Sequence, residues 1–445
     1  MREKEFTRHT LTSGQNSVVR QLPPHGNLRF PPNFLWGTAT AAHQIEGNNI
    51  YNDWWEWEQI ANHIENNDKS RRASNHYELY ETDYSYINRM HNNAYRFSIE
   101  WSRLEPKEGE WDQKAADHYL DQLKSLKAKG ITVMVTLHHF TLPRWLARQG
   151  GFKAPQSVDL FSRYVKFCAE EFGEYVDCWV TFNEPLVYLT QGYMVGVWPP
   201  GESSWSSLFR VAKNLRRSHI SAYKIIHSIL DRPSRKSQVG VAKNIISVFL
   251  YRKYNVIDII VSRLISWNWN HSFLWATKKY HDYLGLNYYF HYRLEKSHWK
   301  TWQFFVDVRR EHREMSDVGW EIYPPGIFSA LLEFKKYRKP IYITENGIAT
   351  RDESRRSRYL VSHLKEIYHA IYAGVDIRGY FYWSLIDNFE WEEGFHPRFG
   401  LIGVNYKTFE REFRDTAKVY REIAKNNMIP HRLLKLLGHA VAFEI

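Results

Sequence analysis

Eight short apolar runs, separated by helix-like segments, are the feature that most limits the fold of this chain. The runs are rich in β-branched and aromatic residues and lack strict polar–apolar alternation, which is typical of parallel strands covered on both faces. We expect each of them to form a buried strand. They span residues 34–39, 94–100, 132–138, 178–182, 239–243, 283–288, 341–344 and 377–383.

Between these runs the sequence changes to the period of an amphipathic helix. Residues 115–129, 158–172 and 354–373 each carry apolar side chains three and four positions apart. Strand followed by helix, repeated without a break, indicates a parallel sheet, and eight such units indicate closure into a barrel. The predicted fold class is therefore α/β, a single-domain (β/α)8 TIM barrel, although 445 residues would also fit two or three domains.

The two ends of the chain lie outside the repeating pattern. Residues 1–28 are polar and charged, and we expect a flexible N-terminal tail. Residues 29–425 then form the barrel, and residues 426–445 a C-terminal extension. Four leucines in this extension predict a short helix: Leu433, Leu434, Leu436 and Leu437.

Composition and charge argue against several classes of protein. A net charge of +11 would suit a nucleic-acid or membrane-surface partner, but the basic residues are spread out and no nucleic-acid-binding motif is present. No run of 18 apolar residues predicts a transmembrane helix, and residues 1–20 lack the apolar centre of a signal peptide. Cys168 and Cys178 are too few for a disulfide framework. We predict a cytoplasmic protein with no nucleic-acid or membrane partner, and the oligomeric state stays open.

Polar side chains follow the predicted strands at their carboxyl ends, where barrel enzymes carry their functional groups. Glu184 and Glu345 lie there, within residues 181–185 and 343–347. Two facing carboxylates are the minimum equipment for cleaving a glycosidic bond, because one protonates the leaving oxygen and the other stabilises or attacks the sugar carbon. The remaining strand ends supply amide, imidazole, guanidinium, carboxylate and indole groups that could bind hydroxyls and stack on a sugar ring: Gln44, Glu46, Arg96, His138, His139, Asn183, Asn287, Tyr289, Trp383, Glu390 and Trp391.

Several long segments, in one order along the chain, carry a resemblance to a known family. They are residues 34–47, 95–98, 101–103, 181–185, 343–347 and 383–391. The chain resembles glycoside hydrolase family 1, the retaining β-glucosidases and β-galactosidases, over roughly residues 30–425. The resemblance implies an exo-β-glycosidase that works by double displacement through a covalent glycosyl-enzyme intermediate, with a β-glycoside as substrate and with no metal or cofactor.

The same resemblance implies roles for five catalytic positions. Glu184 matches the general acid/base and Glu345 the nucleophile. Arg96 and Tyr289 match the positions that keep the nucleophile ionised, and Asn183 matches the position that binds the sugar 2-hydroxyl. In a retaining enzyme the two carboxyl groups lie about 5–5.5 Å apart, and the acid/base must hold its proton until it donates it.

Further positions match the family's substrate contacts. Trp383 corresponds to the platform under the sugar and Trp320 to a wall of the leaving-group site. A carboxylate at Glu390 suits two adjacent hydroxyls and would repel a phosphate, which favours an unphosphorylated sugar. His138 matches no polar role, so we expect it to be packed in the core. The full set of predicted substrate-binding residues is Gln44, His139, Asn287, Trp320, Trp383, Glu390, Trp391 and Phe399.

Two other functions remain open from the sequence. The chain could be a low-activity or non-catalytic protein that binds sugar or a small hydrophobic molecule on the same scaffold, or a transglycosylase that uses the same residues with another acceptor. The sequence does not distinguish a preference for glucose, galactose or fucose.

The chain departs from the family pattern between the fourth and sixth strands. The stretch from Glu184 to Tyr289 is shorter than the pattern, and residues 244–280 are basic and rich in Ile, Val and Trp. We expect local mobility and a wider leaving-group entrance on that side, and an apolar opening that could admit a flat hydrophobic ligand. Phe140 and Ser74-Asn75 also differ from the residues common there, and Phe140 would lose an indole N–H.

Overall fold

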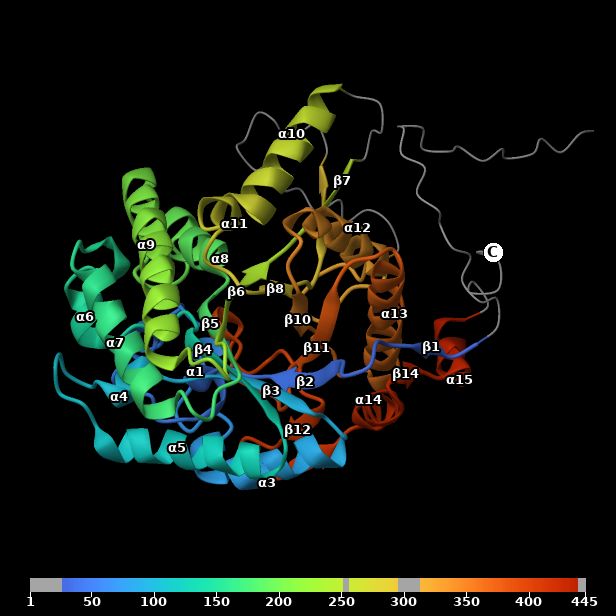
Figure 1. Cartoon of the computed structure of the whole chain (residues 1–445), viewed down its shortest axis with the longest axis horizontal. Coiled ribbons are helices and arrows are strands. Elements are labelled where there is room, and N and C mark those ends of the chain that lie inside the picture. The colour runs from blue at the N-terminus through green and yellow to red at the C-terminus, as the bar shows by residue number, and fades with distance from the viewer. Residues whose placement is uncertain (1–25, 251–255, 295–312, 439–445) are drawn as a thin grey trace, which may run out of the picture.

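Eight parallel strands close into a barrel at the centre of the molecule (Figure 1). The computed structural model describes residues 26–250, 256–294 and 313–438. The strands follow one another around the barrel in chain order, and the last, β11, pairs with the first, β2. They are β2 (Leu35–Ala39), β3 (Ala94–Ser98), β4 (Thr132–His138), β5 (Cys178–Asn183), β6 (Gln238–Asn244), β8 (Leu284–Asn287), β10 (Ile341–Asn346) and β11 (Ile377–Trp383). The predicted (β/α)8 barrel is confirmed.

Half of the predicted strand ends match the structure and half are off by one or two residues, with a difference of two residues at the ends of β3 and β10. β3 ends at Ser98 because Glu100 caps the helix α4 (Trp101–Leu104), its side chain accepting a hydrogen bond from the Ser102 amide. β10 continues through Asn346, because Glu345 is in register with Asn287 of β8 and Asn346 with Tyr382 of β11. Glu345 is thus held by sheet pairing rather than by a loop.

Helices surround the barrel and cover the outer faces of its strands (Figure 1). All three predicted helices begin one or two residues earlier than expected, and Asp112 and Asp352 cap two of them through their side chains. The longer helices are α3 (His76–Arg89), α5 (Gln113–Ala128), α7 (Ser157–Phe172), α9 (Trp205–Leu230), α12 (Pro324–Phe334), α13 (Glu353–Tyr372) and α14 (Asp415–Asn426). Short ones follow strand ends or loops: α1 (Ala42–Ile45), α2 (Asp53–Trp57), α6 (Arg144–Arg148) and α8 (Pro185–Thr190).

The barrel interior is filled by side chains, so it is a second core and not a channel. Met134, Val180 and Phe381 are buried there together, in a cluster separate from the larger core between strands and helices. Gly37 makes room for this packing, because a Cβ at its position would lie 2.5 Å from the Phe381 ring. Polar site residues therefore gather only at the carboxyl ends of the strands.

The two ends of the described chain meet beside the barrel. β1 (Leu28–Arg29) pairs antiparallel with β14 (Met428–Ile429), so Leu28 belongs to a strand and not to a tail. The short helix predicted for the C-terminal leucines is confirmed, as α15 (His431–Leu434) followed by a 3₁₀ turn, Lys435–Leu437. The flexible tail predicted for residues 1–28 falls almost entirely outside the described residues.

The unusual segment after β6 folds into β7 (Ser247–Leu250), α10 (Val256–Ser266), a π-helical turn Trp267–His271 and α11 (Ser272–Ala276). β7 pairs in parallel with β9 (His291–Leu294). The mobility and the wider entrance predicted for this side stay predictions. Within the part of the chain that the structure describes, no helix is both long enough and apolar enough to span a lipid bilayer.

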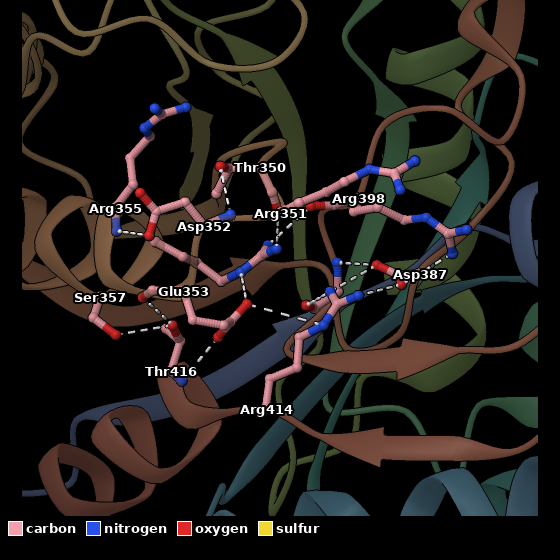
Figure 2. A network of polar contacts seen from close by, with 12 residues as sticks. Thr350, Arg351, Asp352, Glu353, Arg355, Ser357, Asp387, Arg398, Arg414 and Thr416 are labelled. Atoms are coloured by element: carbon pink, nitrogen blue, oxygen red, sulfur yellow. Dashed lines mark hydrogen bonds and ion pairs between the residues drawn. The ribbon is translucent and has the colours of Figure 1, made fainter.

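A buried carboxylate fixes the loop that follows β11. Asp387 is fully buried and accepts hydrogen bonds from Arg398 and Arg414, at 3.2 Å and 2.7 Å. Figure 2 shows both guanidinium groups turned towards it. Arg414 lies between β13 (Arg411–Phe413), which pairs with β12 (Ile402–Val404), and the start of α14. This anchor holds the loop that carries Glu390 and Trp391.

Candidate active site

The predicted catalytic carboxyls lie at the carboxyl ends of two strands, as barrel chemistry requires. Glu184 directly follows β5 and is 7% exposed, and Glu345 lies in β10 and is 3% exposed. Each is surrounded by hydrogen-bond donors, but the donors differ in charge. That difference decides what each carboxyl can do.

Glu345 is held by a cation and a phenol. The Arg96 guanidinium on β3 donates to its Oε1 at 2.5 Å, and the Tyr289 hydroxyl donates to its Oε2 at 2.6 Å. Burial raises the pKa of Glu345, while the charge of Arg96 and the Tyr289 hydrogen bond oppose the rise. Burial and the Glu345 charge raise the pKa of Tyr289 well above its usual value, so it remains a hydrogen-bond donor. The anionic form of Glu345 is therefore directly stabilised.

Glu184 touches amides instead. Asn287 of β8 and Asn244 of β6 both donate to its Oε1, at 2.8 Å and 3.3 Å. Burial raises the pKa of Glu184 to about 7, and the negative charge of Glu345 adds to the rise. A carboxyl with such a pKa is partly protonated at neutral pH and can both give and accept a proton there, which is what a general acid/base needs.

A chain of hydrogen bonds joins the two carboxyls. Asn287 donates to Glu184 and to the Asn183 amide oxygen, the latter at 3.1 Å. That oxygen also accepts from Arg96 at 2.8 Å. Asn287 further opposes the rise in the pKa of Glu345, so one amide acts on both carboxyls. Thr344 fixes this amide by donating to its oxygen at 2.6 Å.

Three residues around the site have left-handed backbone conformations, which non-glycine residues rarely adopt. They are Phe140, Glu184 and Trp391, with φ of 73°, 43° and 52°. Each such residue costs about 1–3 kcal/mol and persists only where the surrounding structure fixes it, a pattern common at active sites. For Glu184 the backbone is fixed by a 2.7 Å hydrogen bond from its amide to the Ala242 carbonyl.

Sugar-binding groups predicted from the sequence meet on the other side of Glu345. Gln44 of α1 donates to Glu390 at 3.0 Å and to Asn388 at 2.9 Å. Burial raises the pKa of Glu390 well above its usual value, the charges of Glu345 and Glu392 add to the rise, and Gln44 and Trp383 oppose it. The hydrogen bond from Trp383 places its indole beside the Glu390 carboxyl.

Aromatic rings frame the hydrogen-bonding groups. The His139 ring lies nearly parallel to the rings of Trp383 and Trp391, with centroids 5.7 Å and 6.0 Å away. Burial lowers the pKa of His139 well below its usual value, so it is neutral, and its Nε2 lies 3.1 Å from the Asn183 amide nitrogen. Parallel indole and imidazole faces suit the flat apolar face of a sugar.

A second aromatic group lies beside Tyr289. Trp320 and Phe399 lie 5.5 Å and 6.2 Å from the Tyr289 ring, between centroids, and 6.2 Å from each other. Trp320 is half-buried and Phe399 is buried. These two rings thus pack against the phenol that binds Oε2 of Glu345.

Comparison with known proteins identifies a family that matches this chain over most of its length. The model of the family described as "Glycosyl hydrolase family 1" matches residues 27–273 and 269–429, which is most of the chain. The chain belongs to glycosyl hydrolase family 1. Its two matched parts meet at residues 269–273, inside the segment where the sequence departs from the family 1 pattern.

Family 1 relatives match over nearly their whole length. Beta-glucosidase A of Thermotoga maritima is 32% identical over 90% of this chain and 98% of its own length. A beta-galactosidase of Pyrococcus woesei is 30% identical over 91% of this chain and 98% of its own. The solved beta-glycosidase from Pyrococcus horikoshii has a TM-score of 0.85 and 40% identity, covering 93% of this chain and 98% of that one. The chain is thus a glycoside hydrolase, and these relatives give no support to a non-catalytic protein.

All predicted site residues of this family 1 chain are brought together by the contacts described above. Two other predicted strand-end residues lie apart. His138 packs among Phe152, Phe182 and Tyr188, and burial lowers its pKa to about 3, so the core role predicted for it is confirmed. Glu46 pairs with Arg103 at 2.7 Å instead of joining the site. Phe140 is buried against Trp198 and Trp391 and forms part of the wall.

Sequence reasoning missed three residues next to Glu184. Asn244 binds its carboxyl, Lys243 lies alongside on β6, and Trp269 donates to the Asn244 amide oxygen at 2.9 Å. One signal was available, because the fifth predicted strand was the only one of the eight to which no polar end residue was assigned. The sequence Lys243-Asn244 ends that strand.

Proposed function

We propose that the protein is a retaining exo-β-glycosidase that hydrolyses terminal, unphosphorylated β-D-glucosyl or β-D-galactosyl residues. The observation that carries this proposal is the pair of buried carboxyls, Glu184 and Glu345, joined through shared amides but surrounded by unlike charges. Relatives named beta-glucosidase and beta-galactosidase support both sugars. A relative solved with glucoimidazole, 31% identical to this chain, supports a small sugar-like ligand.

In the first step Glu345 attacks the anomeric carbon while Glu184 gives its proton to the departing glycosidic oxygen. The bond from carbon to the leaving oxygen breaks and an ester bond to Glu345 forms. Arg96 and Tyr289 support this step because they hold Glu345 ionised and aligned before attack. The proton on Glu184 supports it because a leaving alkoxide is a poor leaving group without one.

In the second step a water molecule attacks the same carbon from the side where the leaving group departed. Glu184, now ionised, accepts a proton from that water, and the ester bond to Glu345 breaks. Two inversions restore the original anomer, so the product keeps the β configuration. Asn183, held by Arg96 and Asn287, is placed to bind the 2-hydroxyl, a contact that strengthens as the oxocarbenium character grows.

Recognition of a chain end is supported by the contact between Gln44 and Glu390. They come from α1 and from the loop after β11, and they bond to each other at 3.0 Å. A sugar chain that passed between them would have to break this contact. The Glu390 carboxyl and the neighbouring Glu345 disfavour a phosphorylated sugar because they present no cation to it.

The test is covalent trapping on the full-length protein. A 2,4-dinitrophenyl 2-deoxy-2-fluoro-β-glucoside should release one dinitrophenolate per protein, and peptide mass spectrometry should place the fluorosugar on Glu345. Proton NMR of p-nitrophenyl β-glucoside hydrolysis should show the β anomer first. A label on another residue, or the α anomer first, would contradict the proposal. Glu108→Gln, at an exposed carboxylate, is the matched control and should label like the parent.

Each charge in these steps has a partner among Arg96, Glu184 and Glu345, so we propose that no metal or cofactor takes part. The flat hydrophobic ligand predicted from the sequence stays a hypothesis, which a spectral screen of the purified protein would test. The predicted cytoplasmic location is supported by Cys168 and Cys178, which are both buried and not bonded to each other.

A further inference from the structure

Lys243 is a buried amine without an ion-pair partner. Its side chain on β6 is completely buried, and its Nζ donates to the Asn244 backbone carbonyl and lies 5.2 Å from the centroid of the Trp269 ring. Within the described residues, no carboxylate oxygen lies within 4 Å of this nitrogen. Burying an unpaired ammonium group costs several kcal/mol, and an apolar side chain of similar length would avoid that cost. Stability therefore does not explain a lysine here.

The lysine lies beside the residue proposed as the acid/base. The Glu184 amide donates to the carbonyl of Ala242, the residue before Lys243, and the Asn244 side chain after it binds the Glu184 carboxyl. The segment 242–244 thus runs along Glu184. The charge of Lys243 acts on Glu184 and lowers the pKa of this carboxyl, opposing burial. Burial lowers the pKa of Lys243 itself to about 7, and the charge of Glu184 opposes that fall, so the lysine is a cation in the acid to neutral range.

Trp269 holds both neighbours of Glu184. Its indole N–H donates to the Asn244 amide oxygen, so the amide nitrogen is the atom left to face Glu184. Its ring face lies under the Lys243 ammonium, the arrangement of a cation–π contact. One residue from the unusual segment after β6 therefore orients the Asn244 amide towards Glu184 and also contacts the Lys243 side chain.

We propose that Lys243 is a positioning residue for the second half of the reaction, in which its cation, held by Trp269 and the Asn244 carbonyl, favours the ionised form of Glu184. The inference rests on the proposed double displacement with Glu184 as acid/base. It adds a residue that touches neither substrate nor water and acts through Glu184.

The other charges around Glu184 explain why the effect differs between the two steps. In the free enzyme the negative Glu345 on β10 faces Glu184 and offsets the lysine, so Glu184 keeps its proton. Once Glu345 is esterified it carries no charge, and Lys243 then acts on Glu184 without that opposition. Arg96 on β3 bonds to Glu345 and Asn183, while Tyr289 and His139 are neutral. The loss of the Glu345 charge lowers the pKa of Glu184 between the steps, and Lys243 lowers the pKa that Glu184 then has.

The test replaces the lysine with neutral residues in the full-length protein. For Lys243→Met, the basic limb of kcat/KM for p-nitrophenyl β-glucoside should move up by about one pH unit, because Glu184 then holds its proton more tightly. With 2,4-dinitrophenyl β-glucoside, whose leaving group needs no acid, kcat at about pH 6 should fall about tenfold, because the covalent intermediate waits for an ionised base. Added azide, which needs no base, should restore turnover.

Three further variants keep the result interpretable. Lys243→Gln should shift the limb in the same direction, which covers a failure of the methionine variant to fold. Lys243→Arg retains the charge and should leave the basic limb in place. Lys124→Met, at an exposed lysine of α5, is the matched control and should change nothing. The melting temperature of Lys243→Met should equal or exceed that of the parent.

Two outcomes would overturn the inference. One is an unmoved basic limb in both neutral variants, and the other is an equal loss for both substrates that azide does not relieve. If the parent protein itself fails to form the fluorosugar adduct on Glu345, the proposed function fails instead. Parent protein that traps the fluorosugar normally, together with unchanged neutral variants, rejects only the role of Lys243.

Discussion

Glu184 and Glu345 are both buried, and apart from the shared Asn287 their partners differ. Glu345 contacts a guanidinium and a phenol, whereas Glu184 contacts two amides and forms no ion pair with a described residue. Burial raises the pKa of both. The comparison teaches that depth alone does not assign a role to a carboxyl. The charge and donor type of its neighbours make one a standing anion and the other a proton carrier.

The largest expected effect comes from removing the anion. Glu345→Gln should lower kcat by about 10⁴-fold or more for every β-glycoside, because no nucleophile remains to form the ester. Steady-state release of p-nitrophenol and of 2,4-dinitrophenol measures this. A loss that depends strongly on the leaving group would contradict the role of Glu345 as nucleophile, because such a dependence is expected for the proton donor, Glu184.

Removing the proton carrier should have a smaller and selective effect. Glu184→Gln should lower kcat/KM by about 10²–10³-fold for a poor leaving group, and much less for 2,4-dinitrophenyl β-glucoside. Azide should accelerate the second substrate and yield a β-glycosyl azide. An equal loss for both substrates, without azide rescue, would mean that Glu184 does not carry the proton.

The pH dependence of kcat/KM tests the different protonation states of Glu184 and Glu345 without any mutation. Glu184 must be protonated for the first step, and its pKa is raised to about 7, so kcat/KM should be lost as pH rises through about 7 and fall about tenfold per unit above it. On the acid side, activity should fall where Glu345 gains a proton. A profile that is flat from neutral to mildly basic pH would contradict the assignment of the basic limb to Glu184.

The smallest expected effect separates the phenol from the guanidinium at Glu345. Tyr289→Phe removes the donor to Oε2 and leaves Arg96 on Oε1, so kcat should fall about tenfold with a smaller change in KM. Burst kinetics would locate the loss in formation or hydrolysis of the intermediate. Tyr342→Phe, on the same strand as Glu345 but with its side chain against Tyr283, is the matched control and should retain activity.

The barrel was predictable because its strands are distinct apolar runs, which can be recognised even when their ends are misplaced by one or two residues. The catalytic pair was predictable because each carboxyl directly ends or extends such a run, where barrel geometry gathers functional groups. The two-residue strands β1 and β14 were not, since two residues have no periodicity and their pairing joins positions about 400 apart in the chain.

The residues around Glu184 could not be predicted from the sequence, for a different reason. Lys243 ends an apolar run and has the pattern of a charge at a strand terminus, a position usually open to water. Its burial depends on Trp269, from a segment that departs from the family pattern. The local sequence pattern predicts which residue types lie at a strand end, but only tertiary packing determines which of these residues are buried away from water.

The Asp387 anchor has a consequence for the order in which the protein becomes active. The loop with Glu390 and Trp391 is tied to Arg414, which the ribosome adds after all eight barrel strands. During synthesis, Glu184 and Glu345 are therefore both present before the loop that carries Glu390 and Trp391 can be anchored. The substrate-binding loop is therefore the last part of the site to be fixed. A chain truncated before Arg414 would keep Glu184 and Glu345 but lose the Arg414–Asp387 ion pair that anchors this loop.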